Sequence, residues 1–336
     1  MTQHRITLWC CWATLLASCV HTTTLPGIPT SPNACYTYQL DHFGFGHNMI
    51  GLSFYVTAYG RPGNKLYVDE SEWSYKCNAS GSWDSFFKGG MPSQLPSPTP
   101  GGPNVTALCL HVGYGEAADA FVALLVHRNL SSSAEDGLQL LAKATQQLWQ
   151  LSDDVSMQAM QQWAFYNRMR KPLAGIHIRA GDKVNEDGPN SNWHNKPAWV
   201  GNLKTLATRN AMNPLESGVM MGDSWTAKLN ATAVMHAEGL HTNLHIVGGK
   251  REAHYQHKFN KETEADRCDE TRSMIMELDA LARTDAFLGS MNSNIPRFVV
   301  LLRAHVYNKT VVTSSDASGF YKWHYDWKKT PVTVAV

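Results

Sequence analysis

Four short apolar runs that alternate with helical segments constrain the fold of this chain more than any other feature of its sequence. Runs of this length, bounded by glycine or charged residues, are typical of buried β-strands. Strands that alternate with helices predict a parallel, doubly wound α/β sheet, because each helix returns the chain to start the next strand in the same direction. The runs occupy residues 173–178, 218–221, 244–247 and 286–288, and helices are expected at 224–238, at 270–283 and from Ile295 onward.

A second α/β region is expected upstream, at residues 34–172. Several prolines between residues 92 and 103 mark a loop there, since proline cannot continue a helix or a central strand. We therefore expect two lobes, at 34–172 and 173–312, followed by a tail at 313–336. The elements expected in the first lobe are a helix with Met49, Leu52, Val56 and Tyr59 on one face, a strand at 65–68, and helices at 134–150 and 155–170.

The N-terminus resembles a secretory targeting signal. His4 and Arg5 precede the uncharged run Ile6–Val20, which is shorter than the ~20 apolar residues of a membrane-spanning helix. This pattern predicts a cleaved signal peptide, and an uncleaved membrane anchor is the alternative. The segment Leu16–Cys19 also matches a bacterial lipoprotein cleavage box. A stem rich in threonine and proline follows, so residues 1–33 are assigned to the signal and stem.

Glycosylation motifs and cysteines agree with a luminal location. Five Asn-x-Ser/Thr sequons and four cysteines beyond the leader predict a glycoprotein of the secretory pathway with two disulfides. Three pairings of four cysteines are possible. Their spacing does not fit a Cys-x-x-Cys zinc site. The formal charge is +1 with no basic tract, which argues against a nucleic-acid partner. The sequons begin at Asn78, Asn104, Asn129, Asn230 and Asn308, and the cysteines are Cys35, Cys77, Cys109 and Cys268.

Polar residues follow three strands of the predicted sheet. Arg179, Asp182 and Lys183 come after the first strand, Asp223 after the second, and the loop 290–294 after the fourth. The carboxyl ends of parallel strands share one edge, where ligands bind. Arginine, lysine and the backbone amides of a helix N-terminus all suit phosphate. The cluster predicts a nucleotide diphosphate site, with Asp223 as acceptor for a base or ribose; a solvated ion pair and a helix cap are the alternatives.

The same residues resemble a known family. His177–Val184 is similar to the first motif of the α1,6-fucosyltransferases of glycosyltransferase family 23, which nodulation fucosyltransferases and protein O-fucosyltransferases share loosely. Residues 271–277 and 285–297 are similar to the family's third motif. Four shorter pieces resemble its N-terminal catalytic region, so colinear matches cover most of residues 35–305. These pieces are 44–48, 58–60, 72–75 and 81–83.

The resemblance implies a fold and a reaction. The fold would be two-lobed and GT-B-like, with a Rossmann-like doubly wound parallel sheet in the C-terminal lobe. The reaction would be an inverting, metal-independent transfer of L-fucose from GDP-fucose to a glycan, of the α1,6 type and on the N-glycan core, in the Golgi. No cofactor is implied. The N-terminal lobe would present the acceptor, and the C-terminal lobe would bind the donor.

The resemblance also implies roles for residues by position. Arg179 would hold the β-phosphate of the donor, with support from Lys183. Asp223 would recognise guanine, and Ser293 would bind phosphate at a helix N-terminus. Glu277 stands where the family has an aspartate, on the donor side.

The remaining positions include the general base and one departure. Asp182 and Ser290 belong to the loops of the donor site, and either Glu186 or Asp187 is the candidate base that takes the proton of the acceptor hydroxyl. Either carboxylate has a solvated loop as its alternative interpretation. The family has a second arginine beside the first, and this chain has Ala180 there. The loss of a charge-assisted contact costs about 1.5–3 kcal/mol, enough to weaken donor binding without abolishing turnover.

Two other functions fit the same sequence. The first is a protein O-fucosyltransferase or another GDP-sugar transferase that shares the motif. The second belongs to a different class: a secreted, disulfide-bonded glycoprotein that binds a nucleotide sugar without turning it over. Both alternatives keep the nucleotide site, and they differ in the acceptor and in catalysis.

Overall fold

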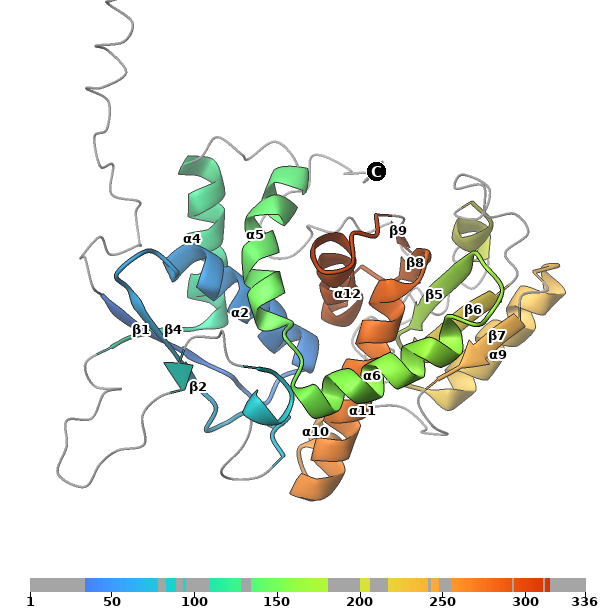
Figure 1. The fold of residues 1–336 in the computed structure, drawn as a ribbon, viewed down its shortest axis with the longest axis horizontal. Helices are drawn as coiled ribbons and strands as arrows, with labels where there is room; N and C mark the ends of the chain where they lie inside the picture. Colours follow the sequence, from blue (N-terminus) through green and yellow to red (C-terminus); the bar gives the residue numbers. More distant parts are fainter. Residues whose placement is uncertain are drawn as a thin grey trace, which may run out of the picture.

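Two parallel β-sheets organise the chain (Figure 1). In the computed structural model the described residues exclude the leader and stem, most of the proline-rich loop, the segment that carries Lys183, and the C-terminal tail. Described are residues 34–77, 83–88, 93–94, 109–127, 134–180, 200–205, 217–240, 243–247, 255–291, 293–310 and 312–314.

The N-terminal sheet has four parallel strands in the order β3-β2-β1-β4. The chain begins in the interior strand β1, winds outward through β2 to β3, and then returns to place β4 on the other side of β1. Helix α2 connects β1 to β2, and α4 follows β4. The bounds are β1 Cys35–Gln39, α2 Phe45–Tyr59, β2 Lys65–Asp69, a 3-10 turn at Trp83–Ser85, β3 Ser93–Gln94, β4 Leu110–Val112 and α4 Tyr114–His127.

The C-terminal sheet has five parallel strands in the order β7-β6-β5-β8-β9. The four strands and the helices predicted from the sequence are all present, with ends that differ by a few residues. The bounds are β5 Leu173–Ile178, β6 Ser217–Gly222, α9 Trp225–Ala237, β7 Asn243–Ile246, α10 Gln256–Phe259, α11 Glu264–Arg283, β8 Ala286–Gly289, α12 Asn294–His305 and β9 Val312–Ser314. The fold class is therefore α/β with parallel sheets, as expected.

Helices cover both faces of the C-terminal sheet. Side chains alternate between the faces of a strand, so neighbouring residues pack against different helices. Met220 of β6 belongs to an apolar cluster with Ala227 and Ala231 of α9. The preceding residue, Val219, packs instead with Ala280 of α11. Burial on both faces explains why these strands are continuous apolar runs in the sequence.

One apolar core continues from the N-terminal sheet to the C-terminal sheet. It contains Tyr38 of β1, Tyr55 of α2, Leu278 of α11, Phe287 of β8 and Phe298 of α12, each at most 1% exposed. Figure 1 shows α11 and α12 between the two sheets. Each buried side chain of this size contributes roughly 1.5–3 kcal/mol, so the contact between the two halves is a large part of the stability. Helices α5 (Ala134–Leu148) and α6 (Asp153–Tyr166) complete this layer.

A buried carboxylate also connects the two halves. Asp279 of α11 is fully buried and accepts hydrogen bonds from Trp149 Nε1 (3.2 Å), Arg283 Nε (2.7 Å) and the Tyr307 hydroxyl. Trp149 follows α5 and Tyr307 follows α12. Because a buried carboxylate is costly unless its acceptors are used, these three donors favour one fixed arrangement of the helices.

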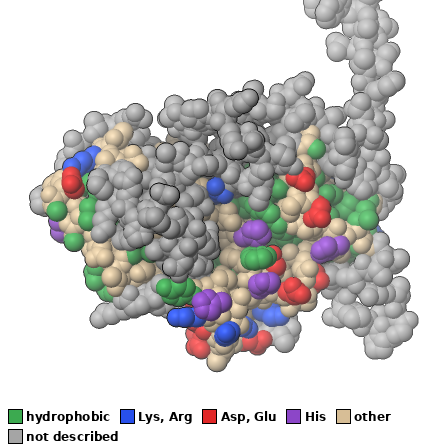
Figure 2. Space-filling model, turned by 180° about the vertical axis from the view of Figure 1, so that it is seen from behind, with side chains coloured by type: hydrophobic (Ala, Val, Ile, Leu, Met, Phe, Trp, Pro, Cys, Tyr) green, Lys and Arg blue, Asp and Glu red, His purple; other side chains and the backbone are tan. Residues whose placement is uncertain are grey.

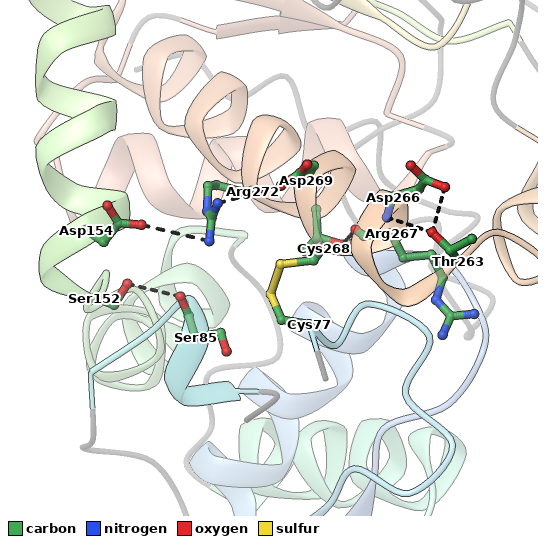
Figure 3. The surroundings of a disulfide bond; sticks show 11 residues. Cys77, Ser85, Ser152, Asp154, Thr263, Asp266, Arg267, Cys268, Asp269 and Arg272 are labelled. Carbon is green, nitrogen blue, oxygen red and sulfur yellow. Dashed lines mark hydrogen bonds and ion pairs between the residues drawn. A yellow bond between two sulfur atoms is a disulfide. The ribbon is translucent and has the colours of Figure 1, made fainter. Parts of the chain in front are cut away.

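The four cysteines form two disulfides, which confirms their predicted number and selects one pairing. Cys35 is bonded to Cys109 within the N-terminal sheet, and Cys77 is bonded to Cys268 of α11. Figure 3 shows the second bond, which joins a segment after β2 to the helix layer of the C-terminal half. Close by, Arg272 of α11 pairs with Asp154 of α6 at 3.8 Å.

Some elements were not predicted or have different bounds. The sequence did not indicate β4, because it has three residues and two of them are exposed. Helix α11 begins at Glu264 and not at residue 270, because the Thr263 hydroxyl accepts a hydrogen bond from Asp266 N and caps the helix there. Helix α6 ends at Tyr166, before the predicted residue 170, and turns follow it.

Two surface features bear on the compartment. Asn230 and Asn308 are exposed, as a glycosylation acceptor must be, and the other three sequons begin outside the described residues. The predicted signal, at residues 1–33, also lies outside them. Within the described part of the chain, every helix is too short or too polar to span a bilayer.

Candidate functional site

The C-terminal sheet changes its winding direction between β5 and β8. From β5 the chain moves outward through β6 to β7, and it then returns to the other side of β5 to form β8. In open parallel sheets such a switch point leaves a crevice at the carboxyl ends of the two strands, and ligands bind there. Arg179 follows β5, and the loop with Ser290 and Ser293 follows β8. Two of the three predicted strand ends therefore flank the switch point, and Asp223 follows the adjacent strand β6.

Arg179 and Asp223 form a mostly buried ion pair at this edge. The side chains are 16% and 10% exposed, and the Arg179 guanidinium donates to Asp223 Oδ2. The other carboxylate oxygen, Oδ1, accepts from the backbone N–H of Ala180 at 2.7 Å. Asp223 thus holds Arg179 in place from the neighbouring strand. The adjacent Ser224, and not Asp223, caps α9, since the Ser224 hydroxyl accepts from Ala227 N at 3.2 Å.

Ala180 is part of an apolar cluster. Its side chain is 5% exposed and packs with Ile178, Val200 and Leu203. A second arginine at this position would have to displace these side chains or leave the cluster. Arg179 is consequently the single cation that the described end of β5 supplies.

His177 lies one position before the end of β5 and shares its side of the strand with Arg179. Burial, together with the nearby cations of Arg179 and Lys228, lowers the pKa of His177 to about 3. The imidazole is therefore neutral at physiological pH. Its Nδ1 is buried and has no hydrogen-bond partner among the described residues.

Lys228 was not singled out from the sequence, because one lysine in a helix is most often solvated. It lies in α9, is 1% exposed, and donates from Nζ to the carbonyl of Val247 at 2.6 Å. Burial lowers the pKa of Lys228, and the negative charges of Glu277 and Asp223 oppose this effect. Lys228 therefore places a cation near the carboxylates of Glu277 and Asp223, and its hydrogen bond to Val247 connects α9 to the end of β7. No signal in the sequence indicated this burial apart from the position of Lys228 four residues after the cap of α9.

Glu277 lies in α11 and is partly buried. Its charge acts on Lys228 and raises the pKa of Tyr166 in α6, after the larger effect of burial. Glu277 and Asp223 both act on the charge of Lys228, so Glu277 lies within electrostatic reach of the residues that follow β6.

The N-terminus of α12 faces the other side of the switch point and has no side-chain cap. Ser293 is its N-cap residue and is 4% exposed, yet its hydroxyl makes no capping hydrogen bond. The first turn contains no acidic residue and contains Arg297, which is 7% exposed. Arg297 donates to the Met291 carbonyl and to Asn294 Oδ1. A cation beside the positive end of a helix dipole is unfavourable on its own, and an anion bound there would offset it.

Arg297 is a second residue that the sequence interpretation missed. Its place in the matched motif was noted, and a helical arginine after a proline gave no reason to expect burial. The N-terminal half of the molecule meets this helix end directly. An ideal Cβ built on Gly46 of α2 would lie 2.8 Å from Asn294 C and Ile295 N, so only glycine allows this approach.

Four of the predicted site residues lie outside the described residues: Asp182, Lys183, Glu186 and Asp187. They belong to the segment that directly follows Ala180. Among the residues that are described, no group of three or more His, Cys, Asp or Glu side chains is placed to hold a metal ion.

Several solved structures have a similar fold, and they are fucosyltransferases, as the sequence resemblance led us to expect. POFUT1 in complex with GDP is 11% identical over 85% of this chain and 99% of its own, with a TM-score of 0.46. A mutant of Arabidopsis thaliana FUT1 in complex with GDP is 12% identical over 86% of this chain and 72% of its own, with a TM-score of 0.48. Fucosyltransferase NodZ from Bradyrhizobium is 14% identical over 86% and 97%, with a TM-score of 0.49.

Sequence comparisons add no closer relative. No protein-family model and no curated protein matches the chain. At the identities and TM-scores above, the likeness to solved structures carries none of the functional argument, which rests on the residues of the switch point.

Proposed function

We propose that this protein is a fucosyltransferase that transfers L-fucose from GDP-fucose to a glycan. The observation that carries the proposal is the switch point between β5 and β8: an arginine held by Asp223 follows β5, and a helix N-terminus without a side-chain cap follows β8. Both features favour a diphosphate: Arg179 offers a charged fork, and α12 offers the backbone N–H groups of Asn294 and Ile295 and the positive end of its dipole. The family resemblance of residues 177–184 and 285–297 supports GDP-fucose as the donor.

The proposed architecture is two-lobed and GT-B-like. Residues 34–172 form the acceptor-side lobe, residues 173–312 form a Rossmann-like donor lobe, and residues 313–336 form a tail. The parallel sheets and their winding support this division. The signal or anchor with its stem, at residues 1–33, directs the protein to the secretory pathway. The protein works in the Golgi lumen or membrane, or is secreted if the signal is cleaved.

Each donor-site residue has a proposed role. Arg179 binds the β-phosphate with support from Lys183, and Ser293 binds phosphate at the N-terminus of α12. Asp182 and Ser290 belong to the loops of the donor site, Glu277 is a further carboxylate on the donor side, and Asp223 recognises guanine. The pairing of Asp223 with Arg179 changes its proposed role: both of its oxygens already accept hydrogen bonds, so Asp223 first of all orients the arginine. Contact with guanine would use its remaining lone pairs.

The proposed reaction inverts the configuration at the sugar. An acceptor hydroxyl oxygen attacks C1 of fucose while the bond from C1 to the β-phosphate oxygen breaks, and the hydroxyl proton passes to the carboxylate of Glu186 or Asp187. Negative charge develops on the departing GDP, and Arg179 with the α12 amides stabilises it. These fixed donors would take the place of a metal, so the reaction is proposed to be metal-independent. The acceptor is proposed to be an N-glycan core, with α1,6 linkage.

A non-catalytic GDP-sugar-binding glycoprotein is the second candidate. The observation that favours it is Ala180, whose burial in an apolar cluster leaves Arg179 as the one arginine at the end of β5. With fewer charge-assisted contacts the site could still bind GDP-fucose, but it would stabilise the negative charge of the departing GDP less. A protein O-fucosyltransferase keeps the same donor site and differs only in its acceptor.

A turnover assay tests the proposal. The protein, expressed through a secretory pathway and assayed in EDTA, is expected to release GDP from GDP-fucose when an asparagine-linked N-glycan core is added. A protein acceptor without glycan is the comparison for the O-fucosyltransferase. GDP binding without release of GDP in the presence of either acceptor would refute transfer and leave the binding glycoprotein.

A further inference from the structure

The N-terminal sheet has a switch point of its own. Strand β1 lies between β2 and β4, and the chain winds away through β2 before it returns to form β4. The carboxyl end of β1 leads into the loop 40–44, and the carboxyl end of β4 leads into Gly113 and Tyr114. By the rule that applies to the C-terminal sheet, the crevice between these two strand ends is a place for a ligand.

Aromatic rings gather at these two strand ends. The His42 and Phe43 rings stack with centroids 4.8 Å apart, and Phe43 meets His47 edge-on at 5.5 Å. The His47 ring stacks on Tyr114 at 3.9 Å with 18° between the planes. We call these four residues the aromatic platform. Phe43 is 53% exposed, and Figure 2 shows a face on which histidine side chains gather beside hydrophobic and acidic ones.

The loop that carries Phe43 is fixed before any ligand arrives. Asn48 of α2 is 1% exposed; its Oδ1 accepts from Asp41 N at 3.0 Å, and its Nδ2 donates to the carbonyls of Asp41 and Phe43. Asp41 Oδ1 accepts from Phe43 N at 2.9 Å. From the C-terminal half, Asn260 donates to the His42 carbonyl at 3.3 Å. An exposed ring on a loop with these bonds loses little freedom when it binds, which favours affinity.

The platform adjoins the proposed donor site. Gly46, next to His47, contacts the backbone of Asn294 and Ile295 at the α12 N-terminus. Burial raises the pKa of Tyr114 to about 12, and the charge of Arg297 opposes this effect, so the Tyr114 hydroxyl lies within electrostatic reach of the first turn of α12. Rings of the N-terminal sheet and phosphate-binding groups of the C-terminal sheet thus border the same junction.

We infer that the aromatic platform binds a sugar ring of the glycan acceptor, an inference that rests on the proposed function. A pyranose ring has a face of C–H groups that packs on an aromatic face, and hydroxyl groups at its rim that need hydrogen-bond partners. Phe43 and His42 supply the aromatic faces. Asp41 and His47, which lie 3.8 Å apart and are each 25% exposed, supply an acceptor and a ring nitrogen. This pairing of stacked rings with a carboxylate suits a neutral sugar.

The test compares glycan binding with GDP binding in three variants. Phe43→Ala removes the exposed ring, Phe43→Trp retains an aromatic face, and Leu110→Ala is the matched control, because Leu110 is also 53% exposed and lies in β4. The probe is an asparagine-linked N-glycan core, titrated by saturation-transfer NMR at saturating GDP. Phe43→Ala is expected to raise the Kd for the glycan about tenfold and Phe43→Trp to keep it within about twofold, while Leu110→Ala and the Kd for GDP stay unchanged.

The outcomes separate this inference from the proposed function. If Phe43→Ala binds the glycan as wild type does, or if wild-type protein with GDP binds no glycan, the platform is not the acceptor site. If glycan binding depends on Phe43 but GDP-fucose is never consumed, the platform stands and the transfer reaction is wrong. If fucose is transferred and Phe43→Ala leaves the KM for the glycan unchanged, transfer stands and the platform is wrong.

Discussion

In the C-terminal sheet the neighbouring strands β5 and β6 end in a mostly buried ion pair, whereas at the switch point of the N-terminal sheet the strands β1 and β4 end in half-exposed rings. Arg179 and Asp223 are paired and at most 16% exposed. Phe43 is 53% exposed, and its ring contacts the rings of His42 and His47. The same winding rule thus positions two kinds of chemistry: one suits a phosphorylated donor, and the other suits a neutral sugar. The two meet where Gly46 approaches α12.

The largest effect is expected when the arginine at the end of β5 is removed. Arg179→Ala leaves the mostly buried Asp223 carboxylate without its arginine partner, so the free energy of unfolding should fall by about 3–5 kcal/mol and GDP affinity by about a hundredfold or more. Urea unfolding and calorimetry measure the two quantities.

Lys204→Ala is the matched control, because Lys204 pairs with Glu238 on the surface at 3.2 Å. It should change stability by less than about 1 kcal/mol. Arg179→Lys retains the charge without the fork and should recover part of the stability. Unchanged GDP affinity in Arg179→Ala would show that the phosphate site lies elsewhere.

The next effect concerns the disulfide that joins the two halves. Cys77→Ser with Cys268→Ser opens a link across 191 residues and should cost about 2–4 kcal/mol of unfolding free energy. It should also raise the KM for the glycan, because the N-terminal half, which carries the aromatic platform, is no longer bonded covalently to α11. Cys35→Ser with Cys109→Ser removes a link across 74 residues within the N-terminal sheet. That pair should leave GDP affinity unchanged; a loss of GDP binding there would contradict the assignment of the donor to the C-terminal sheet.

A smaller effect should appear as a dependence of stability on pH. The folded pKa of His177 is about 3, against an ordinary value of 6.5, so below pH 6.5 the unfolded chain binds a proton that the folded chain does not. Stability from this residue is complete above pH 6.5 and is lost as the pH falls toward 3. Between pH 7 and pH 5 the loss should be about 2 kcal/mol, and His177→Gln should remove that part of the slope in urea unfolding. An identical slope in the variant would contradict the burial of His177.

The smallest effect separates two serine caps. Ser224 caps α9 through its hydroxyl, so Ser224→Ala should cost about 1 kcal/mol of unfolding free energy. Ser293 makes no capping bond in α12, and Ser293→Ala should cost only a few tenths. With GDP bound the order should reverse, because the Ser293 hydroxyl would then contact phosphate. A cost near 1 kcal/mol for Ser293→Ala without ligand would show that the serine is an ordinary cap.

The C-terminal sheet could be predicted because each of its elements carries a local signal. Its strands are buried on both faces and therefore are apolar runs, and each ends in a residue that stands out by charge or size. The carboxyl-end rule then predicted one sheet edge for Arg179, Asp223 and the loop before α12, and the first two of these form an ion pair. Local patterns could not reveal that β8 pairs with β5, which depends on where the chain returns in space.

The residues that were missed have ordinary local surroundings. Lys228 and Arg297 lie in helices whose sequence gives no reason to expect a buried cation, and only the packing of α9 and α12 buries them. The aromatic platform escaped notice for a similar reason. His47 and Tyr114 are far apart in the sequence and meet only because β4 pairs with β1.

A crystal structure of the protein with GDP would locate the diphosphate. We expect it between the ends of β5 and β8, with the Arg179 guanidinium and the backbone N–H groups of Asn294 and Ile295 within hydrogen-bond distance of its oxygens. A diphosphate bound away from α12, or an Arg179 that keeps all of its hydrogen bonds to Asp223 and none to phosphate, would contradict it.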